Sequence, residues 1–128
     1  MHVPLLDLKR QYQQIKDDVT RELLSLCEDQ SFILGTRLEA FERHIAEYIG
    51  CTHAVGVSSG TDAITLALMA LDIQPGDEVI TTPFTFFATA GAIWRVGARP
   101  VFVDIDPVTY NLDPSRIESA VTEKTKAI

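Results

Sequence analysis

The residues best suited to chemistry lie at 56–63, Gly-Val-Ser-Ser-Gly-Thr-Asp-Ala, where a short apolar run ends and a helical pattern begins. Small residues at such a turn let backbone N–H groups close around a ligand, and the unpaired N–H groups of a first helical turn favour an anion. Ser59, Gly60 and Thr61 are therefore candidates for binding a phosphate. The alternative is an ordinary strand-to-helix turn with Ser59 as the N-cap.

Aromatic residues follow the next predicted strand, in Pro-Phe-Thr-Phe-Phe at 83–87. The flat face of Phe86 could stack on a planar ring whose phosphate is bound at Gly60 and Thr61. The alternative is that these phenylalanines belong to the core. For Phe87 the core is the prediction, whereas both interpretations remain open for Phe86.

Other devices for binding or catalysis are absent from the sequence. It contains no Gly-x-Gly-x-x-Gly after the first predicted strand, no Gly-x-x-x-x-Gly-Lys, no Cys-x-x-Cys and no His-Glu-x-x-His. A Rossmann-type dinucleotide site, a nucleoside-triphosphate site and a zinc site are therefore not expected. Asp104 and Asp106 could form a carboxylate pair, but alternate residues point in opposite directions and Asp-Pro is a common turn, so we expect a structural role. No metal site is predicted.

Helices are predicted in the first part of the chain. Apolar residues at three- and four-residue spacing from Leu8 to Leu26 predict a long amphipathic helix. A second helix is expected after a capping box formed by Thr36 and Glu39, and it should end at Gly50. Residues 1–50 are therefore predicted to form an N-terminal helical arm.

From residue 51 onward, short apolar runs alternate with helical stretches. We expect strands at 54–57, 79–82 and 101–104, a further strand beginning at Lys126, and helices at 61–71, at 86–96 and after an Asp113 N-cap. The helix at 61–71 is apolar nearly all round, as a buried helix would be. The alternation predicts an α/β fold with parallel strands and flanking helices, whose strand-ending loops converge on one crevice.

Composition restricts the class of protein. With 11 Lys and Arg against 18 Asp and Glu, the net charge of −7 argues against a nucleic-acid or anionic-membrane surface. No apolar stretch approaches the roughly 20 residues that span a bilayer. Cys27 and Cys51 lack a close spacing, and no signal peptide is recognisable, so a cytoplasmic location is expected.

Together the motifs resemble one family, the DegT/DnrJ/EryC1/StrS sugar aminotransferases, over essentially the whole chain. The matching segments are Ser-Ser-Gly-Thr-Asp-Ala at 58–63, Pro-Gly-Asp-Glu-Val-Ile at 75–80, Pro-Phe-Thr-Phe-Phe-Ala-Thr-Ala at 83–90, Val-Phe-Val-Asp-Ile-Asp-Pro at 101–107 with Tyr-Asn-Leu at 110–112, and the openings Val-Pro-Leu-Leu-Asp-Leu-Lys at 3–9 and Ser-Phe-Ile-Leu-Gly at 31–35. They look like the N-terminal part of these enzymes.

The resemblance implies a pyridoxal-5′-phosphate enzyme of the aspartate-aminotransferase fold (fold type I). Such an enzyme moves an amino group from L-glutamate to a nucleotide-linked keto-sugar, with a lean here toward 3-keto sugars. By the same resemblance Gly60 and Thr61, with Ser59 as a weaker candidate, correspond to the phosphate grip, and Phe86 to the aromatic residue stacked on the cofactor. The resemblance also implies a homodimer to which the N-terminal arm contributes, a loop at 32–35 near the substrate entrance, and a cofactor-binding α/β domain that begins at residue 51.

The chemistry of this cofactor requires a lysine that holds it as a Schiff base and a carboxylate that keeps the pyridine nitrogen protonated. Lys9, Lys16, Lys124 and Lys126 do not stand in the family's lysine motif. Both groups are therefore expected beyond Ile128, and residues 1–128 alone should be inactive. Two alternatives stay open: a pyridoxamine-phosphate-dependent sugar dehydratase of the same fold, and a non-catalytic binding or regulatory module.

Overall fold

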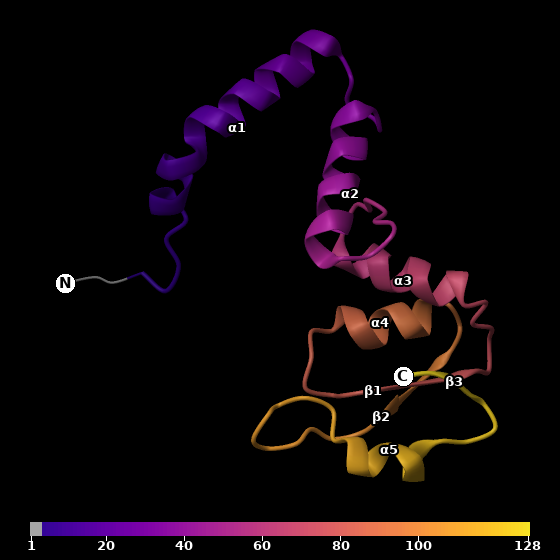
Figure 1. Cartoon of the computed structure of the whole chain (residues 1–128). Coiled ribbons are helices and arrows are strands. Elements are labelled where there is room, and N and C mark those ends of the chain that lie inside the picture. The colour runs from indigo at the N-terminus through magenta and orange to yellow at the C-terminus, as the bar shows by residue number, and fades with distance from the viewer. Residues whose placement is uncertain (1–3) are drawn as a thin grey trace. The chain divides into compact units, whose positions relative to one another are not determined.

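The computed structural model describes residues 4–128, so Val3 of the opening motif lies outside it. The chain divides into two compact units, Met1–Gly56 and Val57–Ile128. The elements, labelled in Figure 1, are α1 (Lys9–Asp29), α2 (Thr36–Ile49), α3 (Gly60–Ala70), β1 (Glu78–Thr81), α4 (Ala88–Arg95), β2 (Arg99–Phe102), α5 (Pro114–Ala120) and β3 (Thr125–Ala127). Within residues 4–128, no helix combines the length and the apolar character needed to cross a membrane.

The first unit consists of α1, α2 and the segment after α2. Arg37, in the first turn of α2, joins the two helices: its guanidinium donates to Ser25 Oγ at 2.7 Å and pairs with the carboxylates of Glu22 and Asp29 on α1. Both predicted helices are therefore present, with α1 continuing to Asp29.

The predicted N-terminal cap of α2 is wrong, whereas the predicted C-terminal end is confirmed. The N-cap is Gly35, with φ of 96° and no side-chain cap, so the predicted capping box of Thr36 and Glu39 is wrong. Thr36 already belongs to the helix, which places its hydroxyl past the capping position. At the other end Gly50 adopts φ of 77° and donates its N–H to the Ala46 and Glu47 carbonyl oxygens, which confirms the predicted stop.

The second unit is built on a parallel sheet with strand order β2-β1-β3. Figure 1 shows α4 on one face of this sheet and α5 on the other. Between the sheet and α3 and α4 lies the core cluster of Leu68, Ile73, Val79, Ala92, Ile93 and Ala98. The predicted parallel arrangement is therefore confirmed.

Residues 54–57 were predicted to form a strand, and this prediction is wrong. The Gly56 N–H, which a sheet neighbour would accept, instead donates to Glu42 Oε1 of α2 at 2.7 Å. Because the Glu42 carboxylate accepts this N–H, residues 54–57 do not form strand hydrogen bonds.

The other boundaries shift by a few residues. β1 and β2 begin and end earlier than predicted, β3 begins at Thr125 rather than at Lys126, and α4 starts at Ala88 rather than at Phe86. The helix predicted to end at residue 96 is followed by Gly97 with φ of 82°, and the predicted Asp113 cap is confirmed, with Pro114 in the first turn of α5. These helix ends depend on capping residues next to them in the chain, so they were predictable. The strand boundaries depend on pairing with a neighbouring strand.

Two burial predictions are wrong for the residues described. In α3, predicted to be buried all round, Leu68 is buried but Leu66 and Met69 are about half exposed or more, because only one face of α3 meets α4 and the core. Phe87, predicted in the core, is 81% exposed. Its position just before α4 directs the ring along the helix surface, where it contacts Gly91.

A buried carboxylate links β1 to β2 and to the segment before β3, near the N-terminal ends of the strands. Glu78, the first residue of β1, accepts hydrogen bonds from Arg99 Nη2 at 2.5 Å on β2 and from Thr122 Oγ1 at 2.7 Å, three residues before β3. These bonds, that of Thr122 first, hold the pKa of Glu78 below its usual value. These contacts stabilise the N-terminal ends of the strands. The candidate site lies at the opposite, C-terminal ends.

Candidate functional site

The N-terminus of α3 presents backbone donors at the position that the sequence singled out. Ser59 is the N-cap, as the alternative interpretation of this turn predicted. Its Oγ accepts the Asp62 N–H at 3.1 Å, and its carbonyl oxygen accepts the Ala63 N–H at 3.0 Å. Within the described part of the chain, the N–H groups of Gly60 and Thr61 have no acceptor. Two amide donors therefore point out of the helix end.

The space beside the Cα of Gly60 is open. A Cβ placed on Gly60 would meet no heavy atom within 4 Å. Gly60 is not at a positive φ, so the backbone conformation does not require glycine. The absence of a side chain here leaves room for another group to approach the backbone closely.

Thr61 and Phe86 line one groove of about 300 Å³, together with Phe87, Ala88, Gly91, Trp94 and Arg95. The Phe86 ring is 80% exposed, so its faces are free for a ligand rather than packed in the core. Gly91 leaves room beneath the Phe87 ring, because an added Cβ would lie 3.0 Å from Phe87 Cε1. The structure thus brings the predicted residues Thr61 and Phe86 to the same groove.

Loops from neighbouring strands also meet, as predicted. The rings of Phe84, after β1, and Tyr110, after β2, have their centroids 5.9 Å apart with an interplanar angle of 32°. Tyr110 has φ of 60°, which is uncommon for a bulky residue, and its N–H donates to the Asp106 carbonyl oxygen at 2.9 Å. No sequence pattern indicates this role of Tyr110, because the contact joins residues that are far apart in the chain.

Asp104 and Asp106 have the structural roles that were predicted. Asp106 Oδ1 accepts the backbone N–H groups of Val108 and Thr109 at 3.0 and 2.7 Å, and these bonds, that of Thr109 first, lower its pKa. Asp104 Oδ1 accepts the Ile105 N–H at 2.8 Å. No group of three or more potential metal ligands occurs among residues 4–128.

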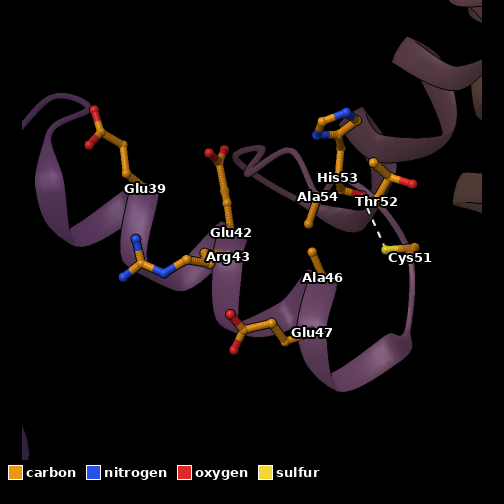
Figure 2. Close-up of a pocket in the computed structure, with 9 residues that line it drawn as sticks. All are labelled: Glu39, Glu42, Arg43, Ala46, Glu47, Cys51, Thr52, His53 and Ala54. Atoms are coloured by element: carbon orange, nitrogen blue, oxygen red, sulfur yellow. Dashed lines mark hydrogen bonds between the residues drawn. The ribbon is translucent and has the colours of Figure 1, made fainter.

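A separate groove of about 450 Å³ lies in the first unit, between α2 and residues 51–54 (Figure 2). Its lining is mostly polar and includes Glu39, Glu42, Arg43 and His53. The Cys51 thiol donates to the His53 carbonyl oxygen at 3.1 Å, shown as the dashed line in Figure 2. None of the predicted site residues lines this groove.

The sequence motifs agree with a comparison against known families. A family model described as the DegT/DnrJ/EryC1/StrS aminotransferase family matches residues 13–128. The chain belongs to this family. The resemblance stated from the motifs is therefore confirmed.

Individual members of the DegT/DnrJ/EryC1/StrS family match the chain closely. It is 56% identical to a Geobacillus stearothermophilus protein named pleiotropic regulatory protein, over 100% of this chain and 34% of that protein. It is 47% identical to the UDP-N-acetyl-3-dehydro-alpha-D-glucosamine 3-aminotransferase of Acidithiobacillus ferrooxidans, over 98% of this chain and 34% of that enzyme. The chain thus spans about a third of the length of these relatives.

A solved aminotransferase-fold structure matches nearly the whole chain. The structure of NtdA from Bacillus subtilis with bound cofactor PMP matches with a TM-score of 0.92 and 38% identity, over 96% of this chain and 28% of that chain. The predicted α/β fold of the fold type I pyridoxal-phosphate enzymes is therefore confirmed for this DegT/DnrJ/EryC1/StrS family chain.

Proposed function

We propose that the protein containing this chain is a pyridoxal-phosphate-dependent nucleotide-sugar aminotransferase, which transfers the amino group of L-glutamate to a nucleotide-linked keto-sugar. The observation that carries this proposal is the groove that joins Thr61, at the free amides of α3, to the exposed ring of Phe86. The name of the Acidithiobacillus ferrooxidans relative supports an amino-sugar product and a 3-keto substrate.

The residues at the groove fit a phosphorylated planar cofactor. An anion at the open side of Gly60 would accept from the two free amides and from the Thr61 hydroxyl, while the helix dipole adds favourable charge. A planar ring attached to that phosphate would stack on Phe86. Pyridoxal phosphate, when bound, supplies an electron sink for the transfer of the amino group.

Ser59 contributes to this site indirectly. Its hydroxyl accepts the Asp62 N–H and donates to the Asp62 carboxylate at 3.0 Å, so its only proton is engaged. Its part is to cap α3, which keeps the Gly60 and Thr61 amides directed outward. The direct contacts to phosphate then come from Gly60 and Thr61.

The remaining parts of the proposal concern the whole protein. No lysine lines the groove among the described residues, so the Schiff-base lysine and the carboxylate for the pyridine nitrogen are proposed to lie outside residues 1–128, which alone would be inactive. Residues 1–50 are proposed as a dimerisation arm and 51–128 as the first part of the cofactor domain of a homodimer. A cytoplasmic location is supported by Cys27 and Cys51, which are both free thiols.

The proposal is tested with the protein purified from the complete gene. Pyridoxal phosphate is added, and the absorption spectrum is recorded before and after borohydride reduction. We expect a cofactor band that reduction fixes to one lysine, followed by glutamate-dependent amination of a UDP-linked 3-keto sugar. Binding without a reducible lysine adduct would favour the dehydratase, and no binding would contradict the enzyme and favour the regulatory role named for the Geobacillus relative.

A further inference from the structure

Asp62, in the first turn of α3, joins the two serines that precede the helix. Its Oδ2 accepts hydrogen bonds from the hydroxyls of Ser58 and Ser59, and its N–H donates back to Ser59 Oγ at 3.1 Å. These bonds, that of Ser58 first, lower the pKa of the Asp62 carboxyl, so it is ionised at neutral pH. One carboxylate therefore organises the whole turn at 58–62.

This network decides which groups remain available to an anion. A serine hydroxyl has one proton, and both serines give theirs to Asp62. The amides of Gly60 and Thr61 stay without acceptors among the described residues. An anion at this helix end would thus meet backbone donors held in place by Asp62.

We propose that Asp62 is a positioning residue, which fixes the turn at 58–61 and so presents the amides of Gly60 and Thr61 to the cofactor phosphate. This inference rests on the proposed function, because the ligand is the phosphate of pyridoxal phosphate. Asp62 acts through Ser58 and Ser59 and does not touch the reacting atoms.

The charge of Asp62 opposes this effect, since a carboxylate repels a phosphate. That repulsion is weak here, because water screens the partly exposed carboxylate and the positive charge of Arg95 acts on it favourably. The two side-chain hydrogen bonds from Ser58 and Ser59, by contrast, act directly on the geometry of the donors, whereas the bond from the Asp62 backbone N–H to Ser59 Oγ does not depend on the side chain. The loss of the hydrogen bonds should therefore dominate when Asp62 is replaced.

The test compares pyridoxal phosphate with pyridoxal, which lacks the phosphate, in binding to the protein from the complete gene. Asp62→Ala should reduce the preference for pyridoxal phosphate about tenfold, while the affinity for pyridoxal changes little. Asp62→Asn should restore most of the preference, because its amide oxygen still accepts a serine hydroxyl. Ser58→Ala, a milder change to the same network, should reduce the preference in the same direction as Asp62→Ala.

Asp113 offers a matched control. It caps α5 and accepts from Ser115 N at 3.0 Å and from Ser115 Oγ at 2.6 Å, so it resembles Asp62 in chemistry but not in place. Asp113→Ala should lower the melting temperature and leave the preference for pyridoxal phosphate unchanged. A loss that reflects general destabilisation would appear in this control as well.

The outcomes separate the two proposals. A wild-type protein that shows no preference for pyridoxal phosphate contradicts the proposed function and, with it, the role of Asp62. A wild-type preference that survives both Asp62→Ala and Ser58→Ala overturns the role of Asp62 alone. A preference that rises in Asp62→Ala would overturn the role of Asp62. So would a preference that falls as far in Asp62→Asn as in Asp62→Ala, because the charge of the carboxylate would then act rather than its hydrogen bonds.

Discussion

Gly60 separates the requirements of folding from those of binding. Since a Cβ at this position would meet nothing in the protein, alanine should fit the folded chain without strain. The same Cβ would occupy the space in which a phosphate must approach the amides. Folding and binding should therefore respond to this residue in opposite ways.

Gly60→Ala is expected to leave the free energy of unfolding unchanged or to raise it by up to about 1 kcal/mol, because alanine is favoured over glycine in a helix. The affinity for pyridoxal phosphate should fall, as measured by titration of the cofactor absorption. Parallel urea unfolding supplies the control. Unchanged cofactor affinity would remove Gly60 from the phosphate contact.

Thr61→Ala removes the one side-chain hydroxyl proposed to donate to the phosphate. The affinity for pyridoxal phosphate should weaken by roughly 1.5 to 3 kcal/mol, the scale of a hydrogen bond to a charged group. Thr65→Ala is the control, because the Thr65 hydroxyl donates to the Thr61 carbonyl oxygen within α3 and to no other group among residues 4–128. An equal loss of affinity for pyridoxal would contradict the assignment of Thr61.

Phe86→Ala tests the stacking surface. Loss of the ring should weaken cofactor binding by about 1 kcal/mol or more, whereas Phe86→Tyr should retain most of the affinity. Phe84→Ala is a matched control, because Phe84 is an exposed ring of the same loop that packs near Tyr110 and does not line the groove. Cofactor dissociation constants from equilibrium dialysis distinguish the three variants.

At the scale of elements, side-chain contacts join the strands at their N-terminal ends, and loops extend from their C-terminal ends. Glu78 joins β1 to β2 through Arg99 and to the segment before β3 through Thr122. At the opposite ends of the strands, the loops carry Phe84, Phe86 and Tyr110. The contacts of Glu78 therefore stabilise the strand starts without involving the loops that carry the candidate site.

Glu78→Gln should destabilise the fold in a pH-dependent way. The pKa of Glu78 is lowered in the folded state, so its stabilising effect is full above its ordinary value of 4.5 and is lost as the pH falls through the folded pKa. The difference in unfolding free energy between wild type and variant should thus be large at about pH 7 and shrink below about pH 4. Urea unfolding at both pH values measures it.

Glu118→Gln is the control for this effect, because Glu118 is exposed on α5 and has no ion pair among the described residues. Its unfolding free energy should match that of the wild type at both pH values. A Glu78→Gln difference that stays constant with pH would show that the contacts do not depend on the charge of the carboxylate.

At the scale of the whole molecule, α1 carries an apolar stripe. Tyr12, Ile15, Val19 and Leu23 follow helical spacing, and each is between 36% and 56% exposed. Such a stripe on a helix is stable in water when another surface covers it. A second copy of the protein is the partner that the proposed homodimer would supply.

Ile15→Glu should therefore shift the protein from dimer toward monomer, because the new charge would have to be buried in the interface. Gln13→Glu is the matched control, since it adds the same charge to the opposite side of α1. Size-exclusion chromatography with light scattering gives the mass of each variant. A monomeric wild type, or an Ile15→Glu variant that remains a dimer, would contradict this role of the stripe.

The sequence by itself determined the features that depend on neighbours along the chain. The side chains of Ser59 and Asp113 accept backbone N–H groups two or three residues further along the chain, so these helix starts were predictable. Gly50 and Gly97 adopt a left-handed backbone, so these helix ends were predictable as well. The alternation of helix and strand patterns predicted the parallel sheet, and the sheet edge predicted that Thr61 and Phe86 would lie close together.

Only the tertiary structure decided the features that depend on residues far away in the chain. Residues 54–57 have strand-like composition, but the Glu42 carboxylate, 14 residues before Gly56, takes the amide that a strand would need. Phe87 is apolar, but its place before α4 leaves it in solvent. A sequence pattern records what a residue prefers, whereas its partner is chosen by which groups the fold brings within hydrogen-bonding or packing distance.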